Sequence, residues 1–301
     1  MKRNFKIVGL TLAVTAVLVA VVAVAAGASG DRKARRVVDV AVAPVAFARD
    51  AASVPRGKYL FESRGCGDCH GADGKGRTFI DSPNGLYVKS PNITSGPGGV
   101  VKTYTERDWV RSIRHGVNPQ GLPLLIMPSQ DYNRLTDQDL AAVVAYTRSL
   151  PPVAGEGAVI RLPLIVKALY AFGAVRDAAE TIDHSLPPST PVPVGATVQH
   201  GAYVANMCVG CHGIALSGGK IPGAPPEWPA AANLTPGAGT AMTSCDSAEK
   251  FTAMMRTGKR PDGSEVSKVM PFTSLRMLDD TDLEAVHVYL KALPPRATGN
   301  R

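Results

Sequence analysis

The sequence predicts an all-α protein made of two copies of one domain behind an N-terminal hydrophobic segment. Three observations carry this prediction. A run of 20 uncharged residues lies near the N-terminus, a set of landmark residues recurs in the same order after about 142 residues, and each copy ends in a helical pattern of apolar residues. No strand-like alternation of useful length occurs in either copy.

The hydrophobic segment runs from Ile7 to Ala26. Such a length in a helix can cross a bilayer, and it exceeds the usual apolar core of a signal peptide. It therefore favours a retained transmembrane anchor within residues 1–29. Because Ala26-Gly27-Ala28 offers the small residues that a signal peptidase needs, removal of the segment stays open as the alternative.

The formal charge of +8 belongs mainly to the flanks of this segment. Residues 1–36 carry seven of the 33 basic side chains and one of the 25 acidic ones, so the rest of the chain is close to neutral. A nucleic-acid-binding protein would need a basic stripe on its folded part, so this class is excluded. Basic residues flank both ends of the segment, and charge alone leaves its orientation open.

The second half of the chain repeats the landmarks of the first half. The offsets vary by one or two residues, as loop insertions produce, and matching landmarks in one order indicate a duplicated domain. We expect the copies at 55–152 and 196–296, with a tether at 30–54 and a linker at 153–195. The matching residues are Cys66 and Cys208, Cys69 and Cys211, His70 and His212, Asn92 and Asn233, Gly116 and Gly258, Met127 and Met270, and Leu150 and Leu293.

Each copy is expected to begin and end with a helix. The first helices, at 57–64 and 200–207, run into a cysteine pair. The last helices have N-cap residues Thr136 and Asp279, each followed three residues later by an acid, and prolines stop both helices.

The linker contains an apolar stretch from 159 to 175. It is too short and too charged for a comfortable membrane span, so we predict a helix that lies across the domains. A role at a membrane surface or partner is the alternative to a simple connector. A proline-rich spacer follows at 185–193.

Two Cys-x-x-Cys-His motifs carry the chemistry. This spacing lets both thiols add to the vinyl groups of a haem and places the histidine under the iron. A zinc ribbon needs its cysteine pairs about 15–20 residues apart, and a thioredoxin-like dithiol needs a βαβ setting. These pairs are 142 residues apart in a helical context. The sequence therefore predicts two covalently bound haem c groups, held by Cys66, Cys69 and His70 and by Cys208, Cys211 and His212.

Each iron is predicted to take a methionine as its sixth ligand. Met127 and Met270 lie 57 and 58 residues after their histidines, and each precedes a proline and the last helix. A thioether suits low-spin iron and raises its reduction potential. Iron with both axial positions filled has no site for a substrate, which indicates an electron carrier and no catalytic residue. Competing methionines occur only in the second copy, at Met242, Met254, Met255 and Met277.

Other reactive residues are expected to be structural. We interpret Cys245 as a small buried residue, with a functional thiol as the alternative. His70 and His212 could each donate their second ring nitrogen to a loop carbonyl near Asn92 or Asn233. Core or surface positions are expected for the remaining histidines, which are His115, His184, His200 and His287.

Both copies resemble the class I cytochrome c domain, which has an N-terminal helix, Cys-x-x-Cys-His, a loop, Met-Pro and a C-terminal helix. The pieces Asn92-Ile93-Thr94 and Asn233-Leu234-Thr235, the Leu-Pro-Pro ends and the apolar linker are similar to the cytochrome subunits of membrane-bound alcohol and gluconate dehydrogenases. Those subunits carry three haems and this chain has two motifs, so the resemblance leaves the specific dehydrogenase partner open.

The resemblance implies electron relay between a quinol- or dehydrogenase-linked donor and a terminal oxidase or another cytochrome. Haem attachment of this kind takes place on the outer face of the bacterial inner membrane. It implies an N-terminus inside and both domains in the periplasm, or a soluble periplasmic protein if the segment is removed. A dihaem cytochrome c peroxidase is an alternative, but it needs one displaceable axial position, and Met127 argues against this. A subunit that docks a soluble dehydrogenase at the membrane is a third possibility.

Overall fold

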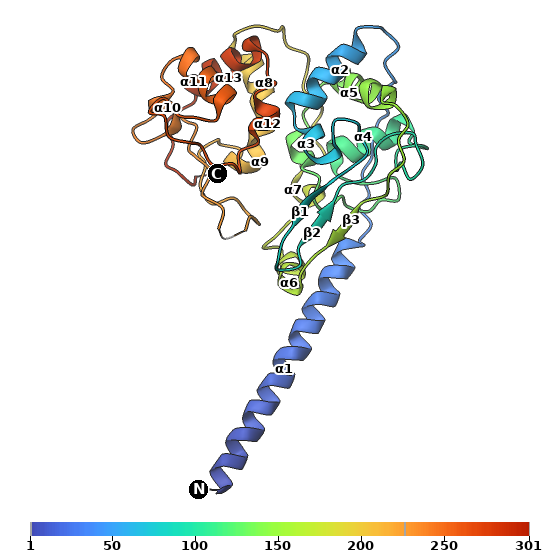
Figure 1. Ribbon diagram of the computed structural model, residues 1–301, viewed down its shortest axis with the longest axis vertical. Coiled ribbons are helices and arrows are strands. Elements are labelled where there is room, and N and C mark those ends of the chain that lie inside the picture. The colour runs from blue at the N-terminus through green and yellow to red at the C-terminus, as the bar shows by residue number, and fades with distance from the viewer. Residues whose placement is uncertain (1, 226, 301) are drawn as a thin grey trace.

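The structure is a computed structural model that describes residues 2–225 and 227–300. Two mostly helical domains lie side by side at one end of a long N-terminal helix (Figure 1). The tandem arrangement and the N-terminal helix agree with the sequence prediction. The prediction of an all-α fold is confirmed only in part, because three short strands from the first domain and the linker form a sheet.

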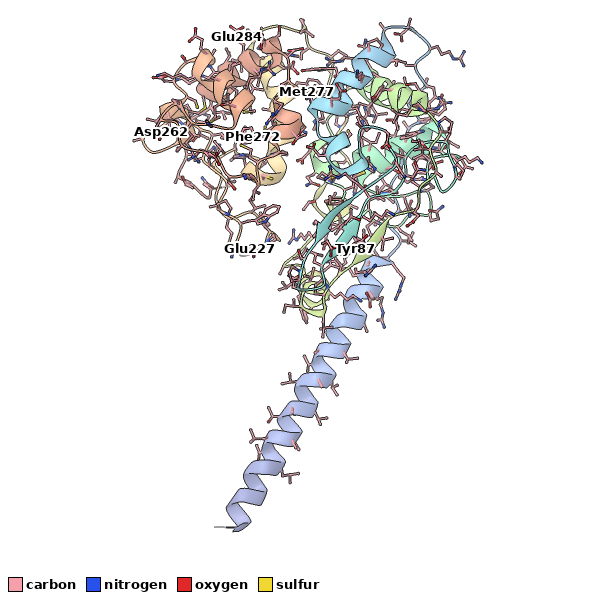
Figure 2. All side chains as sticks on the ribbon, viewed as in Figure 1. Tyr87, Glu227, Asp262, Phe272, Met277 and Glu284 are labelled. Atoms are coloured by element: carbon pink, nitrogen blue, oxygen red, sulfur yellow. The ribbon has the colours of Figure 1, made fainter. Side chains whose placement is uncertain are left out.

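Helix α1 spans Lys2–Ala34, and its part Leu10–Ala34 is long and apolar enough to cross a membrane. Figure 2 shows the side chains of this part projecting outward along most of its length, without neighbours from the domains. Beyond α1 the chain runs without helix along the first domain, where the side chains of Val40 and Val42 are buried.

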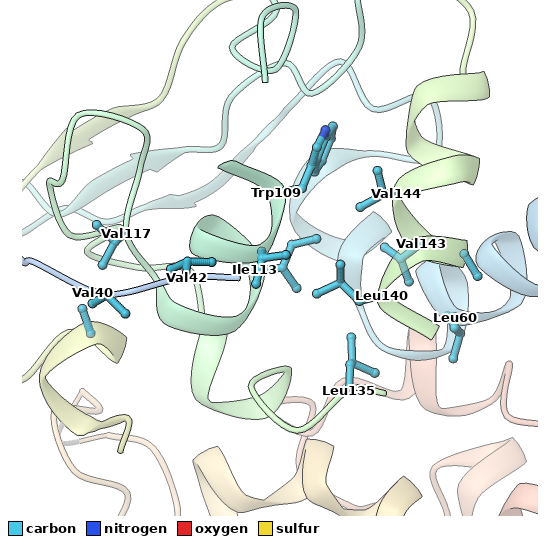
Figure 3. Packing of buried hydrophobic residues seen from close by; sticks show 13 residues of the cluster. Val40, Val42, Leu60, Trp109, Ile113, Val117, Leu135, Leu140, Val143 and Val144 are labelled. Atoms are coloured by element: carbon cyan, nitrogen blue, oxygen red, sulfur yellow. The ribbon is translucent and has the colours of Figure 1, made fainter. Parts of the chain in front are cut away.

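The first domain is built on the packing of its first and last helices. At their crossing, a Cβ added to Gly57 would overlap the carbonyl of Ala142, so only glycine allows this approach. Leu60, Trp109 and Leu140 are among the buried side chains that fill the space between the helices (Figure 3). The helices are α2 (Ser53–Ser63), α3 (Cys66–His70), α4 (Glu106–His115), the one-turn η1 (Ser129–Asp131) and α5 (Asp137–Ser149).

A small antiparallel sheet corrects the prediction for the linker. Its strands, in the order β1-β2-β3, are β1 (Thr78–Asp81), β2 (Tyr87–Lys89) and β3 (Val159–Arg161). The predicted helix over 159–175 therefore begins as a strand, with Ile160 opposite Val88. Pro163 ends the strand and stands at the N-cap of helix α6 (Leu164–Ala171). The β-branched residues before the proline pair with the open edge of β2, a partner about 70 residues away that local periodicity does not reveal.

The second domain repeats the packing of the first. Gly201 lies against the carbonyl of Ala285 as Gly57 lies against Ala142. The predicted N-caps are confirmed, because Thr136 accepts from the Asp139 N–H at 3.0 Å and Asp279 accepts from the Asp282 N–H at 2.7 Å. Helix α7 (Ala178–Thr181) precedes this domain, whose elements are α8 (Val198–Ala205), η2 (Asn206–Cys208), α9 (Val209–His212), α10 (Ala241–Ser244), α11 (Ala248–Thr257), α12 (Phe272–Leu275) and α13 (Asp280–Ala292).

The two domains meet through reciprocal contacts. Tyr59 of α2 donates to Asp282 of α13 at 2.6 Å, and Tyr203 of α8 donates to Asp139 of α5 at 2.6 Å. Each tyrosine oxygen also accepts the backbone N–H of the N-cap residue of the other domain's last helix. Arg64, which is buried, adds an ion pair to Asp282 at 2.9 Å. These contacts hold the two domains in one arrangement.

Candidate cofactor sites

The first cysteine pair lies on the short helix α3, which glycines bracket. Gly65 before Cys66 has a φ of 80°, and Gly71 after His70 has a φ of 76°. This left-handed backbone is open to glycine at little cost. It lets the chain turn into and out of a single helical segment, so that both cysteines and the histidine are presented together.

An apolar cavity in the first domain brings the predicted ligands together. Cys66, Cys69, His70 and Met127 all line it. The other walls are mainly apolar and include Phe61, Ile93, Trp109, Ile113, Ile126 and Val143. An apolar cleft with two thiols, an imidazole and a thioether matches the donor set and surroundings of a covalently attached haem. The residues present therefore fit this group.

The histidines of both motifs are oriented by loop carbonyls. The Nδ1 atom of His70 lies 3.1 Å from the carbonyl oxygen of Pro91, and Nδ1 of His212 lies 2.8 Å from that of Ala232. The two carbonyls belong to the residues directly before Asn92 and Asn233, and the sequence had suggested a loop carbonyl near these asparagines as the partner. A proton on Nδ1 leaves the lone pair on Nε2, the nitrogen that would face a metal. Burial lowers the pKa of His70, which favours the neutral ring that metal binding requires.

The two methionines stand on the same kind of turn. The N–H of Ser129 donates to the carbonyl of Met127 at 2.9 Å, and the N–H of Phe272 donates to that of Met270 at 2.8 Å. In each case the intervening proline caps a one-turn helix. The hydroxyl of Ser129 also donates to the Ser112 carbonyl at 3.0 Å, which ties the first turn to α4.

Cys208 and Met270 both pack, half-buried, against the hydrophobic core of the second domain. The competing methionines have other positions. Met242, Met254 and Met255 belong to the buried core itself, and Met277 is 45% exposed. This distribution leaves Met270 as the methionine that matches Met127.

Family models match both domains. Residues 52–146 match the model for cytochrome c oxidase, cbb3-type, subunit III, and residues 198–294 match the model for cytochrome c. Both domains belong to the cytochrome c family. The cofactor of this family is haem c, and the chain is a dihaem c-type cytochrome.

Curated relatives of this cytochrome are named as cytochrome subunits. The fructose dehydrogenase cytochrome subunit of Gluconobacter japonicus is 27% identical over 81% of this chain and 53% of its own length. The alcohol dehydrogenase (quinone) cytochrome c subunit of Gluconacetobacter polyoxogenes is 28% identical over 82% of this chain and 57% of its own. A diheme cytochrome c-type of Cereibacter sphaeroides is 29% identical over 36% and 40%. The cytochrome spans about half the length of the first two, and all three relatives are named as cytochromes or cytochrome subunits.

The two sites of the cytochrome are neighbours across the domain interface, which the sequence analysis missed. Asp131, four residues after Met127, accepts the N–H of Gly210 at 2.9 Å, inside the second cysteine pair. Ser274, four residues after Met270, lies beside Gly65 at the start of α3. The sequence contains one indication of this proximity, because Asp131 and Ser274 occupy matching positions of the repeat. Burial raises the pKa of Asp131 to about 7, partly offset by the hydrogen bond from Gly210.

The remaining histidines and the fifth cysteine have structural partners. His200 contacts Asp282 at 2.7 Å, and His287 contacts the carbonyl of Cys245 at 3.1 Å. His115 and His184 pair with each other, their Nδ1 atoms 3.0 Å apart. Cys245 is fully buried, as predicted, and its thiol lies 3.6 Å from the Met254 sulfur.

Proposed function

We propose that this cytochrome is a membrane-anchored electron relay with two six-coordinate haems, one in each of the domains 55–152 and 196–296. The observation that carries the proposal is the cavity that His70 and Met127 share with the first cysteine pair. The repeat extends the same assignment to His212 and Met270. A haem iron held in this way cycles between the ferrous and ferric states by one electron.

The chain's own residues set the properties of each centre. The cysteines would attach haem through thioether bonds, and the carbonyls of Pro91 and Ala232 hold the histidine rings in place. Met127 and Met270 would each supply a thioether sulfur to the iron, which would raise its reduction potential and leave no position for a substrate. The apolar walls of the cavity in the first domain would limit the access of water, which also favours a higher potential.

The proposed location is the bacterial inner membrane, with the domains in the periplasm. Helix α1 supports the membrane by its length and apolar surface. The two haem-attachment motifs support the side, because haem of this kind is attached on the outer face of this membrane. Release as a soluble periplasmic protein is the alternative. The mass of the N-terminal peptide, measured on protein from the native membrane, distinguishes the retained anchor from the cleaved form.

The proposed donor is a dehydrogenase or a quinol-linked enzyme, and the proposed acceptor is a terminal oxidase or another cytochrome. The relatives named for fructose and alcohol dehydrogenases support a dehydrogenase as the partner. Purification of the full chain in mild detergent should bring a dehydrogenase subunit with it. Recovery of the cytochrome alone, with no electron transfer from dehydrogenase-containing membranes, would count against this partner.

Substitution of the methionines tests the ligation directly. Met127→Ala and Met270→Ala should each convert one of the two haems to high spin and lower its reduction potential, because the thioether is lost. Absorption spectra and redox titration of the detergent-purified chain measure both effects. Met277→Ala, at an exposed methionine of the second domain, is the matched control and should leave both haems unchanged. An unchanged spectrum in Met127→Ala or Met270→Ala would show that another residue binds that iron.

Carbon monoxide binding distinguishes the relay from a peroxidase. Two six-coordinate haems should bind carbon monoxide slowly in the reduced protein and should not turn over hydrogen peroxide. Rapid binding at one haem together with peroxide turnover would favour the dihaem peroxidase.

A further inference from the structure

The linker helix α6 packs tightly against the end of α1 that is nearest the domains. Ala26, Gly27 and Gly30 of α1 form a buried stripe at helical spacing. A Cβ added to Gly27 would lie 2.6 Å from Cδ1 of Leu164, and one added to Gly30 would overlap the carbonyl of Lys167. Small residues at these positions therefore let the two backbones approach each other closely.

Three ion pairs fix this contact on the domain side. Lys167 pairs with Asp31 at 2.8 Å, Lys33 with Glu180 at 2.9 Å, and Arg36 with Asp177 at 2.7 Å. Arg36 also donates to the hydroxyl of Tyr170, which is buried at the end of α6. The linker is thus held at a fixed position along α1, just beyond the apolar stretch of that helix.

The free face of α6 is apolar and exposed. Ile165 and Leu169 of α6 and its C-cap residue Phe172 follow one another at a spacing of four and three residues, with exposed fractions of 66%, 41% and 79%. Leu164 beside them is 49% exposed. In Figure 1, α6 lies at the base of the two domains, directly beside the upper part of α1. Helix α6 therefore lies beside the domain-side end of α1, next to the point where the run of exposed large apolar side chains on α1 ends at Val24.

We propose that α6 is a membrane-interface helix that inserts Ile165, Leu169 and Phe172 into the outer leaflet beside α1. The proposal rests on the anchoring role proposed for α1. The lipid bilayer is the occupant because α6 is fixed to the end of the segment that would leave the membrane. A helix that lies in the plane of the interface with one apolar face in the lipid is a recognised mode of lipid binding. The contact also gives Gly27 a structural role, since cleavage after Ala28 would remove its packing against Leu164 and leave only the contacts of Gly30 and the residues after it.

Spin-label accessibility in lipid nanodiscs tests this proposal on the full-length holoprotein. In a Cys245→Ala background, single cysteines replace Ile165 or Phe172 on α6 and carry a nitroxide label. Val17→Cys in the middle of α1 reports the anchor, and Val194→Cys, an exposed apolar residue directly after the proline-rich spacer, reports water. Oxygen, which concentrates in lipid, and nickel-EDDA, which stays in water, are the two collision probes.

The expected result is an oxygen-to-nickel accessibility ratio at Ile165→Cys and Phe172→Cys several-fold above that at Val194→Cys, and below that at Val17→Cys. A lipid-like Val17→Cys with water-like labels on α6 would overturn the interface helix and leave the anchor intact. A water-like Val17→Cys would instead overturn the proposed anchor. A third outcome is that the labels on α6 show low oxygen accessibility and become immobile only after membrane extract is added. This outcome would indicate a protein partner and overturn the lipid assignment.

Discussion

At the scale of single residues, Asn92 and Asn233 link each histidine-orienting loop to the chain that follows the last helix. The amide of Asn92 donates to the Val153 carbonyl at 2.8 Å, and its oxygen accepts the Thr94 N–H at 2.9 Å. Asn233 makes the matching bonds to the carbonyl of Arg296 and to the N–H of Thr235. Both side chains are buried. Because the carbonyl before each asparagine orients a histidine, this link stabilises the proximal side of both sites.

Asn92→Ala should destabilise the first domain by about 1–3 kcal/mol, because it leaves the buried Thr94 N–H without its partner and removes one of the two donors to the Val153 carbonyl. Chemical denaturation of the holoprotein, followed by haem absorption, measures the loss. Asn84→Ala is the matched control, since Asn84 is exposed and accepts one backbone N–H from Leu86 in a turn. We expect a change of at most about 0.5 kcal/mol there. Equal losses in the two variants would contradict the structural role of Asn92.

At the scale of helices, duplication accounts for the fit between the domains. Tyr59 and Tyr203 occupy the same turn of the first helix, and Asp139 and Asp282 occupy the same turn of the last helix. Each tyrosine reaches across to the aspartate of the other copy. A contact pair formed twice from one repeated motif resembles the self-complementary interface of a homodimer. Each aspartate also binds a partner within its own domain, Arg56 for Asp139 and His200 for Asp282.

The double variant Tyr59→Phe, Tyr203→Phe should weaken the attachment of the domains, because two interdomain hydrogen bonds to carboxylates are lost. Each bond contributes about 1.5–3 kcal/mol by the usual measure for hydrogen bonds to charged groups. Calorimetry should show the two domains unfolding less cooperatively than in the original chain. Tyr146→Phe, in the first domain, keeps its edge-to-face packing on Phe61 and serves as control. A single unchanged transition in the double variant would show that other contacts govern the interface.

The helices, their caps and the cysteine motifs could be predicted from sequence because their signals are local. The Thr136 and Asp279 caps, for example, lie three residues from their acids. The β2–β3 pair was missed because strands of three residues carry little periodicity and their partners are far apart in sequence. The interdomain pairs were missed because each tyrosine and each aspartate is, in the sequence, an ordinary polar residue. Their pairing becomes evident only when the two copies are placed together in space. The cavity was predicted only as a set of ligands, since its walls come from several loops.

At the scale of the whole molecule, buried carboxylates connect segments that are distant in sequence. Asp139 and Asp282 join the two domains, and Asp177 joins the linker to Arg36, two residues after the end of α1. Burial would raise the pKa of each carboxyl. Hydrogen bonds and charges from arginines outweigh burial and hold the pKa of each one below its usual range. The arrangement of domains and anchor therefore depends on these groups remaining ionised.

This dependence predicts loss of stability in acid. An aspartate has a pKa of about 3.9 in an unfolded chain, and these carboxyls have a lower pKa when folded. Their contribution is complete above about pH 4 and is lost as the pH falls through the folded-state pKa.

Asp139→Asn should therefore lower the thermal midpoint at pH 7 and show a smaller further decrease in acid than the original chain does. All titratable groups other than Asp139 are the same in both proteins, so the difference reports Asp139. Asp81→Asn, at an exposed carboxylate of β1, should follow the original chain throughout. Parallel curves for Asp139→Asn and the original chain between pH 7 and pH 3 would mean that the interdomain carboxylate does not couple the fold to pH.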